Sequence, residues 1–520
     1  MEGDTAAQDA GRRSWANRML DVVERTGNRL PDPITVFVIF AGIVLVLSWL
    51  GSVLGLSAVH PAEETTVQAE NLLTSESIQR ILADMPETFT DFPPLGLVLV
   101  VMLGIGIAER SGLVETALKA FVRSVPDSLI TGAIVLAGLL SSLAVDAGYV
   151  VLIPLGALIF HGMGRHPIAG LAAAFAGVSG GFSANISLTA LDPLLASFTE
   201  PASHIVDPAY SVDVTANWWL MIAMVPVYTL AGWWVTERII EPRLGDYDGE
   251  ADVEENGGND ELTPEEKRGL WAAGLTLLAT LLVIALMAVP SDGVLRADEP
   301  DLLDSIQPLL DSIVALMLFV FFLPGLAYGL VTKKVKSDKE VASMTAETMA
   351  SMGAYIVLAF VAAHFIAFFD WSNLGVILAI TGAEQLERLQ AVGVPGVAII
   401  VAFVLVSAFI NLFIGSASAK WAIMAPVFVP MLMLVGYSPE LTQAAYRLGD
   451  SFTNILTPLL PYYPLVIIFA QRYQKDIGLG TIISAMLPYS VVFAVGSIGM
   501  LVLWMLLEWP LGPGVPMFLQ

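Results

Sequence analysis

The stretches "GGFSANISLTALDP" (Gly180–Pro193) and "GDSFTNILTPLLP" (Gly449–Pro461) interrupt long apolar segments with glycine, serine, asparagine and proline. Main-chain polar groups in hydrocarbon must be hydrogen-bonded within the protein, so non-helical backbone at that depth occurs where it lines a cavity or lies inside the protein. One interruption lies in each half of the chain. Together they predict a binding site to which both halves contribute.

The composition is that of a membrane protein. The chain has 520 residues, of which 56% are hydrophobic and 14% are charged, whereas soluble domains carry about 25% charged residues. Apolar runs such as 34–56 and 270–289 are long enough to cross hydrocarbon, which takes about 20 helical residues. The sequence therefore predicts an all-α polytopic membrane protein.

Several classes of site and partner are excluded or disfavoured. The chain has no cysteine, which excludes disulfides, iron–sulfur clusters and cysteine zinc sites. A net charge of −25, much of it in the loop 245–266, disfavours a nucleic-acid partner and is explained by a solvated acidic linker. The phosphate-binding pattern GxxxxGK[ST] is absent from the sequence, so this chain has no such loop through which ATP could drive it.

Charge placement predicts the topology. Straight membrane spans are predicted near 34–56, 94–109, 216–238, 269–289, 308–331, 350–369 and 484–507, and the regions 127–200 and 393–472 contain more apolar sequence than one straight helix needs. The basic segment before the first span is expected in the cytoplasm, because Lys and Arg favour that side. No basic residue follows Lys475, so the C-terminus is expected outside.

The predicted organisation has four parts. These are a cytoplasmic N-terminal tail (1–29), a first membrane half with a re-entrant hairpin and a broken helix (30–240), an acidic cytoplasmic linker (241–267), and a second membrane half of the same kind (268–520).

The two halves contain a weak internal repeat. Residues 146–175 align without a gap on residues 418–447, at a constant offset of 272, and three extra residues follow in the first copy. The aligned pairs are Pro154 with Pro426, Pro167 with Pro439, Tyr149 with Trp421, and, beyond the insertion, Asn185 with Asn454. Broken helices at matching places in two halves indicate the binding site of a secondary transporter. Helix N-termini freed at such breaks attract anions, and asparagine and carbonyl oxygens suit hard cations such as Na⁺.

Three long segments carry a family resemblance. They are "GGFSANISLTALDPLLASFTEPA" (180–202), "INLFIGSASAKWAIMAPVFVPML" (410–432) and "YSPELTQAAYRLGDSFTNILTPLLPYYP" (437–464). They closely resemble the p-aminobenzoyl-glutamate transporter (AbgT) family. The resemblance implies a homodimer in the bacterial inner membrane, with about nine transmembrane helices, two re-entrant hairpins and inverted repeats in each protomer. Family members are associated with p-aminobenzoyl-glutamate uptake and sulfonamide export, coupled to cation gradients.

The resemblance also implies site residues. The substrate-binding positions that match the family are Asp192, Ser418, Trp421, Pro439, Arg447 and Pro458, and Asn185 joins them as the counterpart of Asn454. The positions that resemble sodium ligands are Asn411, Gly415, Asp450 and Asn454. Na⁺ is the expected coupling ion, with H⁺ as the alternative, and no organic cofactor is expected.

Each charged or aromatic candidate has an ordinary structural alternative. Asp192 contacts substrate or ion, or caps a helix, because a carboxylate at bilayer depth needs a partner. Arg447 and Asp450 are spaced to neutralise each other on one helix; otherwise the Arg447 fork binds a carboxylate and Asp450 binds the cation. Trp421 stacks on a substrate ring or anchors at the interface. Lys420 snorkels or pairs with a carboxylate.

The sequence thus favours cation-coupled secondary transport of small aromatic organic anions across the lipid bilayer. Two other classes stay open at this point. One is an intramembrane enzyme that uses Asp192 and Asp450 as paired carboxylates, and the other is a passive anion channel. The direction of transport is also open.

Overall fold

The computed structural model describes residues 33–59, 65–143, 148–247, 262–299, 305–457, 460 and 462–519. The predicted tail at 1–29, most of the predicted linker and the predicted site residue Pro458 lie outside the described residues. Among the described residues the helices and strands comprise many helices and one antiparallel pair, β1 (Ser57–Val59) and β2 (Thr66–Gln68). The predicted all-α polytopic class is confirmed.

The first half contains α3 (Pro33–Leu54), α4 (Ser75–Ala83), α5 (Met85–Thr90), α6 (Pro93–Arg110), α7 (Leu113–Arg123), α8 (Ile130–Leu140), α9 (Ile153–Gly162), α10 (Pro167–Phe175), α11 (Leu191–Ser203), α12 (Trp218–Val235) and α13 (Glu241–Leu244). The second half contains α14 (Pro264–Ala288), α16 (Gln307–Asp311), α17 (Ile313–Val331), α18 (Asp338–Ser351), α19 (Gly353–Trp371), α20 (Leu374–Ala391), α21 (Gly396–Asn411), α22 (Ala417–Leu434), α23 (Pro439–Asn454), α24 (Tyr463–Gln471) and α25 (Leu479–Leu506). Two π-helical turns, η4 (Gly148–Leu152) and η5 (Ala176–Gly180), lie beside the breaks of the first half.

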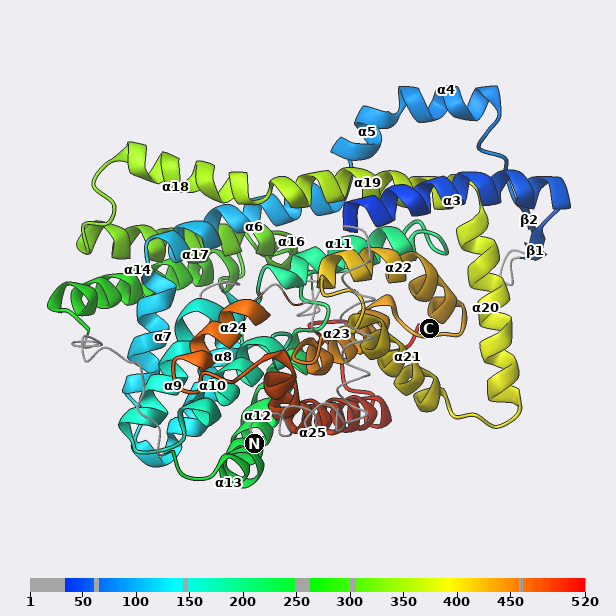
Figure 1. The fold of residues 1–520 in the computed structure, drawn as a ribbon. Helices are drawn as coiled ribbons and strands as arrows, with labels where there is room; N and C mark the ends of the chain where they lie inside the picture. Colours follow the sequence, from blue (N-terminus) through cyan, green and yellow to red (C-terminus); the bar gives the residue numbers. More distant parts are fainter. Residues whose placement is uncertain are drawn as a thin grey trace, which may run out of the picture.

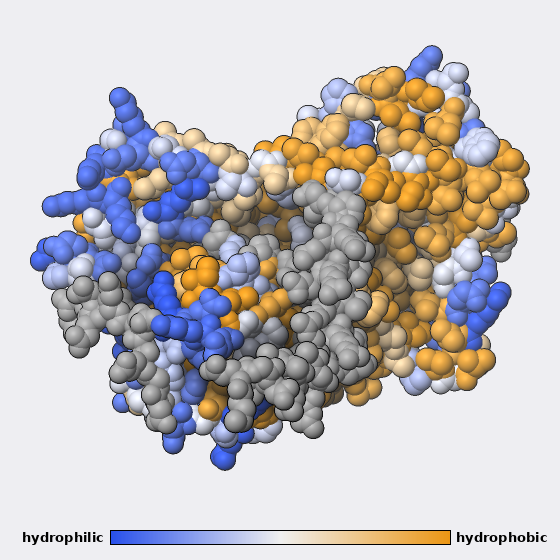
Figure 2. Space-filling view, in the orientation of Figure 1, coloured by the Kyte–Doolittle hydropathy of each residue, from blue (hydrophilic) through white to orange (hydrophobic). Residues whose placement is uncertain are grey.

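A helix covers each of the seven predicted straight spans, namely α3, α6, α12, α14, α17, α19 and α25. Within the described chain, seven helices are long and apolar enough to cross a membrane, and they include α22 but not α6. Helix α6 qualifies only together with α7, as an eighth candidate bent by 61°. Apolar surface covers much of one end of the molecule in Figure 2, while hydrophilic residues gather at the other. A total of nine spans and the re-entrant depth of the hairpins stay predictions.

The helices form an outer layer and a core. In Figure 1, α3, α6, α14, α17 and α19 run roughly parallel across the upper part of the molecule. Within this layer α17 packs between α6 and α14, and α3 packs along α19. Helices α8–α12 and α21–α25 form the core beside it. The broken helices are therefore enclosed mostly by protein.

The order of elements repeats. The series α6 to α12 is matched by the series α19 to α25. In both, the turn between the fourth and fifth helices has a glycine with positive φ, Gly164 at 71° and Gly436 at 95°. A side-chain cap follows two residues later, from His166 or Ser438, and then a proline at the first helical position. All these positions are 272 residues apart, so the offset found in the sequence also relates local structure.

The matching turns lie at opposite ends of the molecule. In the first turn, Arg165 forms an ion pair with Glu241 of α13 at 2.6 Å. In the second, the Ser438 amide donates to the Met517 carbonyl at 3.0 Å near the end of the chain. Helices α7 and α20, the second helices of the two matched series, likewise lie at opposite ends in Figure 1. This placement is what an inverted repeat predicts, and the inverted relation of the two halves stays a prediction.

Close glycine contacts join α9 to α10. A Cβ atom added at Gly170 would lie 2.2 Å from the Gly156 carbonyl oxygen, and one added at Gly156 would lie 2.6 Å from the Gly170 carbonyl oxygen. The two backbones thus touch without side chains between them, as small residues allow in membrane proteins.

Gly170→Ala is expected to separate these helices and destabilise the protein by about 1–3 kcal/mol, the usual cost of overpacking. The measurement is thermal loss of monodisperse protein in detergent, followed by size-exclusion chromatography. Gly162→Ala is the control, since nothing lies within 4 Å of a Cβ atom there. Equal melting temperatures for the two variants would contradict the close-packing interpretation.

Candidate substrate and ion site

The two interruptions lie side by side in the core. The first runs from the end of η5 at Gly180 to the start of α11, and the second runs from the end of α23 to the start of α24. The Ser451 hydroxyl donates to the Gly180 carbonyl at 2.9 Å, and the Asn454 amide donates to the Ser179 hydroxyl at 3.1 Å. Both halves therefore contribute to one polar region, and its role as the predicted binding site stays a prediction. The second break begins at Ile455, a few residues later than its first glycine suggested.

A buried ion pair joins the two halves. Arg447 of α23 donates to Asp192 of α11 at 2.7 Å, and their side chains are 2% and 7% exposed. The other oxygen of Asp192 accepts from the Thr189 amide at 2.6 Å and from its hydroxyl at 2.9 Å. Asp192 therefore both holds the turn at Thr189, just before α11, and pairs with Arg447. The alternative in which Arg447 and Asp450 neutralise each other is wrong.

Asp450 instead pairs with Lys420. The Lys420 ammonium is bound by the Asp450 carboxylate and also donates to the Asn411 side-chain oxygen at 2.7 Å. The Asn411 amide group donates to the Asp450 carbonyl at 2.8 Å and to the Thr453 hydroxyl at 3.0 Å. All these groups are buried. A side-chain ammonium thus lies against two residues that the sequence assigned to a coupling cation.

The four predicted sodium positions divide into two groups. Asn411 and Asp450 surround Lys420, while Gly415 and Asn454 line a neighbouring cavity. The described residues contain no cluster of three His, Asp or Glu side chains suited to a metal ion. The neutral oxygens and the single carboxylate here suit a monovalent cation better than a tightly held metal.

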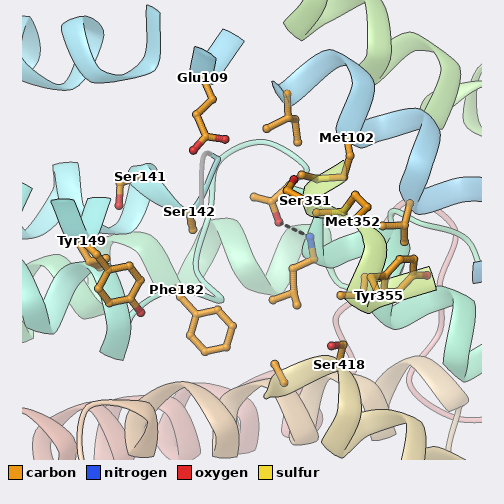
Figure 3. A pocket seen from close by; sticks show the side chains of 18 of the residues that line it. Met102, Glu109, Ser141, Ser142, Tyr149, Phe182, Ser351, Met352, Tyr355 and Ser418 are labelled. Atoms are coloured by element: carbon orange, nitrogen blue, oxygen red, sulfur yellow. Dashed lines mark hydrogen bonds between the residues drawn. The ribbon is translucent and has the colours of Figure 1, made fainter. Parts of the chain in front are cut away.

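The cavity has a volume of about 650 Å³ and lies between the first-half break and the outer layer. Figure 3 shows Tyr149 and Phe182 on one side, Met352 and Tyr355 on the opposite side, and Ser418 at one end. The lining is apolar over most of its area, with four aromatic side chains and several neutral polar ones among the aliphatic residues, and the ionisable residues in it are Glu109, Arg110 and the tyrosines. Arg110 is exposed, so the cavity reaches the surface where α6 meets α7.

Three other predicted residues lie outside the cavity lining. Trp421 is fully buried, its indole N–H donates to the Thr199 hydroxyl at 2.9 Å, and its ring stacks on Tyr446 with centroids 4.4 Å apart. Pro439 is the first residue of α23 and supports the buried turn beside the end of the chain. Asn185 donates to the hydroxyl of the lining residue Ser142 at 2.5 Å, and its own side-chain oxygen is buried with no hydrogen-bond partner among the described residues.

Trp421 belongs to a buried chain of hydrogen bonds that runs toward the α11–α12 loop. Its members in order are Trp421, Thr199, Gln443, Asn217, Glu440 and Tyr210. Burial, reinforced by the Glu440 carboxylate, raises the pKa of the Tyr210 phenol, so Tyr210 stays a donor at the end of the chain. This network fixes α11, α12, α22 and α23 relative to one another.

Two kinds of participant were absent from the predicted site. The sequence does indicate a role for Lys420 in the site, because a lysine within an apolar segment needs an internal anionic partner. The sequence indicates a site role for Tyr149 and Tyr462 less strongly, since aromatic residues are common in apolar helices. Their place in the cavity lining comes only from the tertiary structure.

Comparison with known proteins identifies the relatives of this chain. The model of the AbgT putative transporter family matches residues 18–519. The p-aminobenzoyl-glutamate transport protein of Escherichia coli (strain K12) is 37% identical over 502 residues, which cover 96% of this chain and 97% of that protein.

Two solved structures have the same fold. The Alcanivorax borkumensis YdaH transporter has a TM-score of 0.87 and 43% identity, covering 93% of this chain and all of that one. Neisseria gonorrhoeae MtrF, described with a class of antimetabolite efflux pumps, has a TM-score of 0.89 and 45% identity, covering 96% of this chain and all of that one.

The ion pair between Asp192 and Arg447 predicts a double-variant pattern. Asp192→Asn or Arg447→Gln alone is expected to destabilise the protein by about 3–5 kcal/mol, because each leaves a buried charge without its partner. The double variant is expected to recover most of that stability and to remain inactive. Thermal stability and uptake into proteoliposomes are the two measurements.

The matched control is Glu347→Gln, which removes the acidic partner of Arg110 from a partly exposed ion pair. Exposed pairs contribute about 0–1 kcal/mol, so its stability should change little. A double variant no more stable than either single variant would show that the pair does not account for the loss.

Proposed function

The chain belongs to the AbgT family, and we propose that it is a cation-coupled secondary transporter of small aromatic organic anions such as p-aminobenzoyl-glutamate. Its family and relatives are transporters, which excludes the intramembrane enzyme considered from the sequence. Export of sulfonamide-type antimetabolites is included in the proposal, because one structural relative is described with antimetabolite efflux pumps. The same binding site serves import and export, because the imposed gradients set the direction of net flux.

A buried donor beside the cavity supports an anionic substrate most directly. The Nε atom of Arg447 is buried and has no hydrogen-bond partner in the described chain, while one terminal nitrogen holds Asp192. Thr189, which binds Asp192, lines the cavity. A substrate carboxylate that displaced Asp192 would meet a planar fork with an unused N–H, the geometry in which arginine binds carboxylates. Arg447 would then take the glutamate end of the substrate.

The remaining cavity surface suits the rest of such a substrate. Aromatic side chains can stack on a benzene ring, and Ser418 and Asn454 offer hydrogen bonds to amide groups. A volume of about 650 Å³ lies within the range of small-molecule sites, about 300–1,000 Å³.

The Lys420–Asp450 pair supports coupling to a cation. A coupling Na⁺ that used the Asp450 carboxylate and Asn411 would compete with the Lys420 ammonium for the same oxygens. Displacement of the ammonium would move α22 relative to α23, because Lys420 and Asp450 lie on these two helices. Binding of the ion and movement of the helices would thereby be linked. H⁺ is the alternative coupling ion.

The proposal includes the setting of the protein. Basic residues before the first span favour a cytoplasmic N-terminus and an external C-terminus, in a bacterial inner membrane. The α7 end of the molecule is then cytoplasmic. A homodimer is proposed from the family resemblance.

Transport is tested with labelled p-aminobenzoyl-glutamate and a labelled sulfonamide in proteoliposomes, with Na⁺ and pH gradients imposed separately. Accumulation above the outside concentration is expected only when one of the two gradients is present. Equilibration at the same rate without any gradient would support the passive channel instead. Protein-free liposomes give the background.

Lys420→Met is expected to strengthen Na⁺ binding, because it removes the competing ammonium and keeps the Asp450 carboxylate and Asn411. The measurement is the rise of thermal stability with Na⁺ at constant ionic strength, compared with choline. A change of tenfold in the Na⁺ concentration required would correspond to about 1.4 kcal/mol. The control is Lys420→Met combined with Asp450→Asn, in which the Na⁺ effect should vanish; an equal effect in both variants would place the cation elsewhere.

A further inference from the structure

The cavity wall carries a pair of stacked tyrosines, one from each half of the chain. Tyr149 of η4 and Tyr462, directly before α24, have ring centroids 3.9 Å apart and planes 8° from parallel, and both line the cavity. Phe175 meets Tyr149 edge-on, with centroids 6.5 Å apart. The pair forms a supported aromatic surface, and its existence depends on how the two halves are placed relative to each other.

The counterpart of Tyr149 in the second half has a different environment. The offset of 272 places Tyr149 over Trp421. Trp421 is fully buried, bound to Thr199 and stacked on Tyr446, and it is not part of the cavity lining. In this conformation the first-half aromatic residue faces the cavity and its second-half equivalent is packed against protein.

The two residues also contact the opposite half at different depths. The Trp421 N–H reaches Thr199, well inside α11. Tyr149 meets Tyr462. The offset between the paired residues Asn185 and Asn454 aligns Tyr462 with Pro193, which lies in the first turn of α11. Trp421 and Tyr149 therefore contact the opposite half at different positions along equivalent helices. This difference makes the two otherwise matching halves asymmetric.

We propose that Tyr149 and Trp421 alternate as the aromatic contact for the substrate ring. Tyr149, together with Tyr462, binds the ring in the conformation described, and Trp421 binds it in the conformation open to the other side of the membrane. Alternating access in inverted-repeat transporters moves one repeat against the other around a fixed site. If the halves exchange their arrangements, the environments of Tyr149 and Trp421 exchange as well. This inference rests on the proposed transport function and adds to it the residues that select an aromatic substrate on each side.

The test compares two substrates supplied from defined sides. p-Aminobenzoyl-glutamate carries the ring, and N-acetylglutamate has the same dicarboxylate without it. Because the chain has no cysteine, a single Ser124→Cys substitution in the exposed segment after α7, reacted with an impermeant maleimide, reports and selects the orientation of the protein in proteoliposomes.

Tyr149→Leu is expected to raise the KM for p-aminobenzoyl-glutamate about five- to tenfold when the substrate is supplied on the α7 side, since an aromatic pair of this kind is worth about that factor. The KM for the opposite side and both KM values for N-acetylglutamate should change less than about twofold. Tyr149→Phe is the matched control, because it keeps the ring. Tyr462→Leu should reproduce the effect of Tyr149→Leu from the other half.

Trp421→Leu is expected to show the reverse sidedness, with Trp421→Phe as its matched control because it keeps a ring. If Trp421→Leu does not fold, Tyr149→Leu and Tyr462→Leu still decide the proposal. Equal effects of Tyr149→Leu on both sides, or on both substrates, would overturn the alternation. Wild-type protein that transports no p-aminobenzoyl-glutamate would overturn the proposed function itself. Wild-type transport that Tyr149→Leu leaves unchanged would overturn only the aromatic role.

Discussion

The structure depends on the requirement that charges and main-chain polar groups away from water find partners inside the protein. The broken helices expose backbone that α-helices would otherwise satisfy, and side chains from the opposite half bind it, as Ser451 does at Gly180. Both buried acidic side chains of the site are held by basic ones, Asp192 by Arg447 and Asp450 by Lys420. The polar centre is therefore electrically neutral, which makes its place in an apolar protein possible.

Neutrality also explains how such a site can respond to solutes. Each member of a buried ion pair gains an alternative partner only when an ion with the same sign as its present partner binds. In the proposed mechanism, an anion replaces Asp192 at Arg447 and a cation replaces Lys420 at Asp450. Each replacement would free a charged side chain that must find a new contact, and on this proposal the same four residues couple binding to helix position.

The sequence was sufficient for the class of protein and for the places of most long apolar helices, because hydropathy is a local signal. The predicted span at 94–109 is the exception, since α6 is long enough to cross a membrane only together with α7, at a bend of 61°. The offset of 272 also predicted matching structure, since glycine and proline impose the same turn wherever they recur. The pairing of charges was not predictable in this way. Arg447 and Asp450 are correctly spaced on one helix, yet each prefers a partner on another helix, and which partner is available depends on packing between halves. Likewise, the sequence alignment related Tyr149 to Trp421 but could not show which of them faces the cavity.

The ion pair between Asp192 and Arg447 joins residues separated by 255 positions in the chain. At ribosomal rates of about 5–20 residues per second, Asp192 enters the bilayer on the order of tens of seconds before Arg447 has been synthesised. During that interval the carboxyl group must be protonated, remain near the lipid headgroups or be sheltered by the insertion machinery. The first half is thus delivered as an incomplete folding unit, and its biogenesis ends only when the last third of the polypeptide supplies the missing counter-charge.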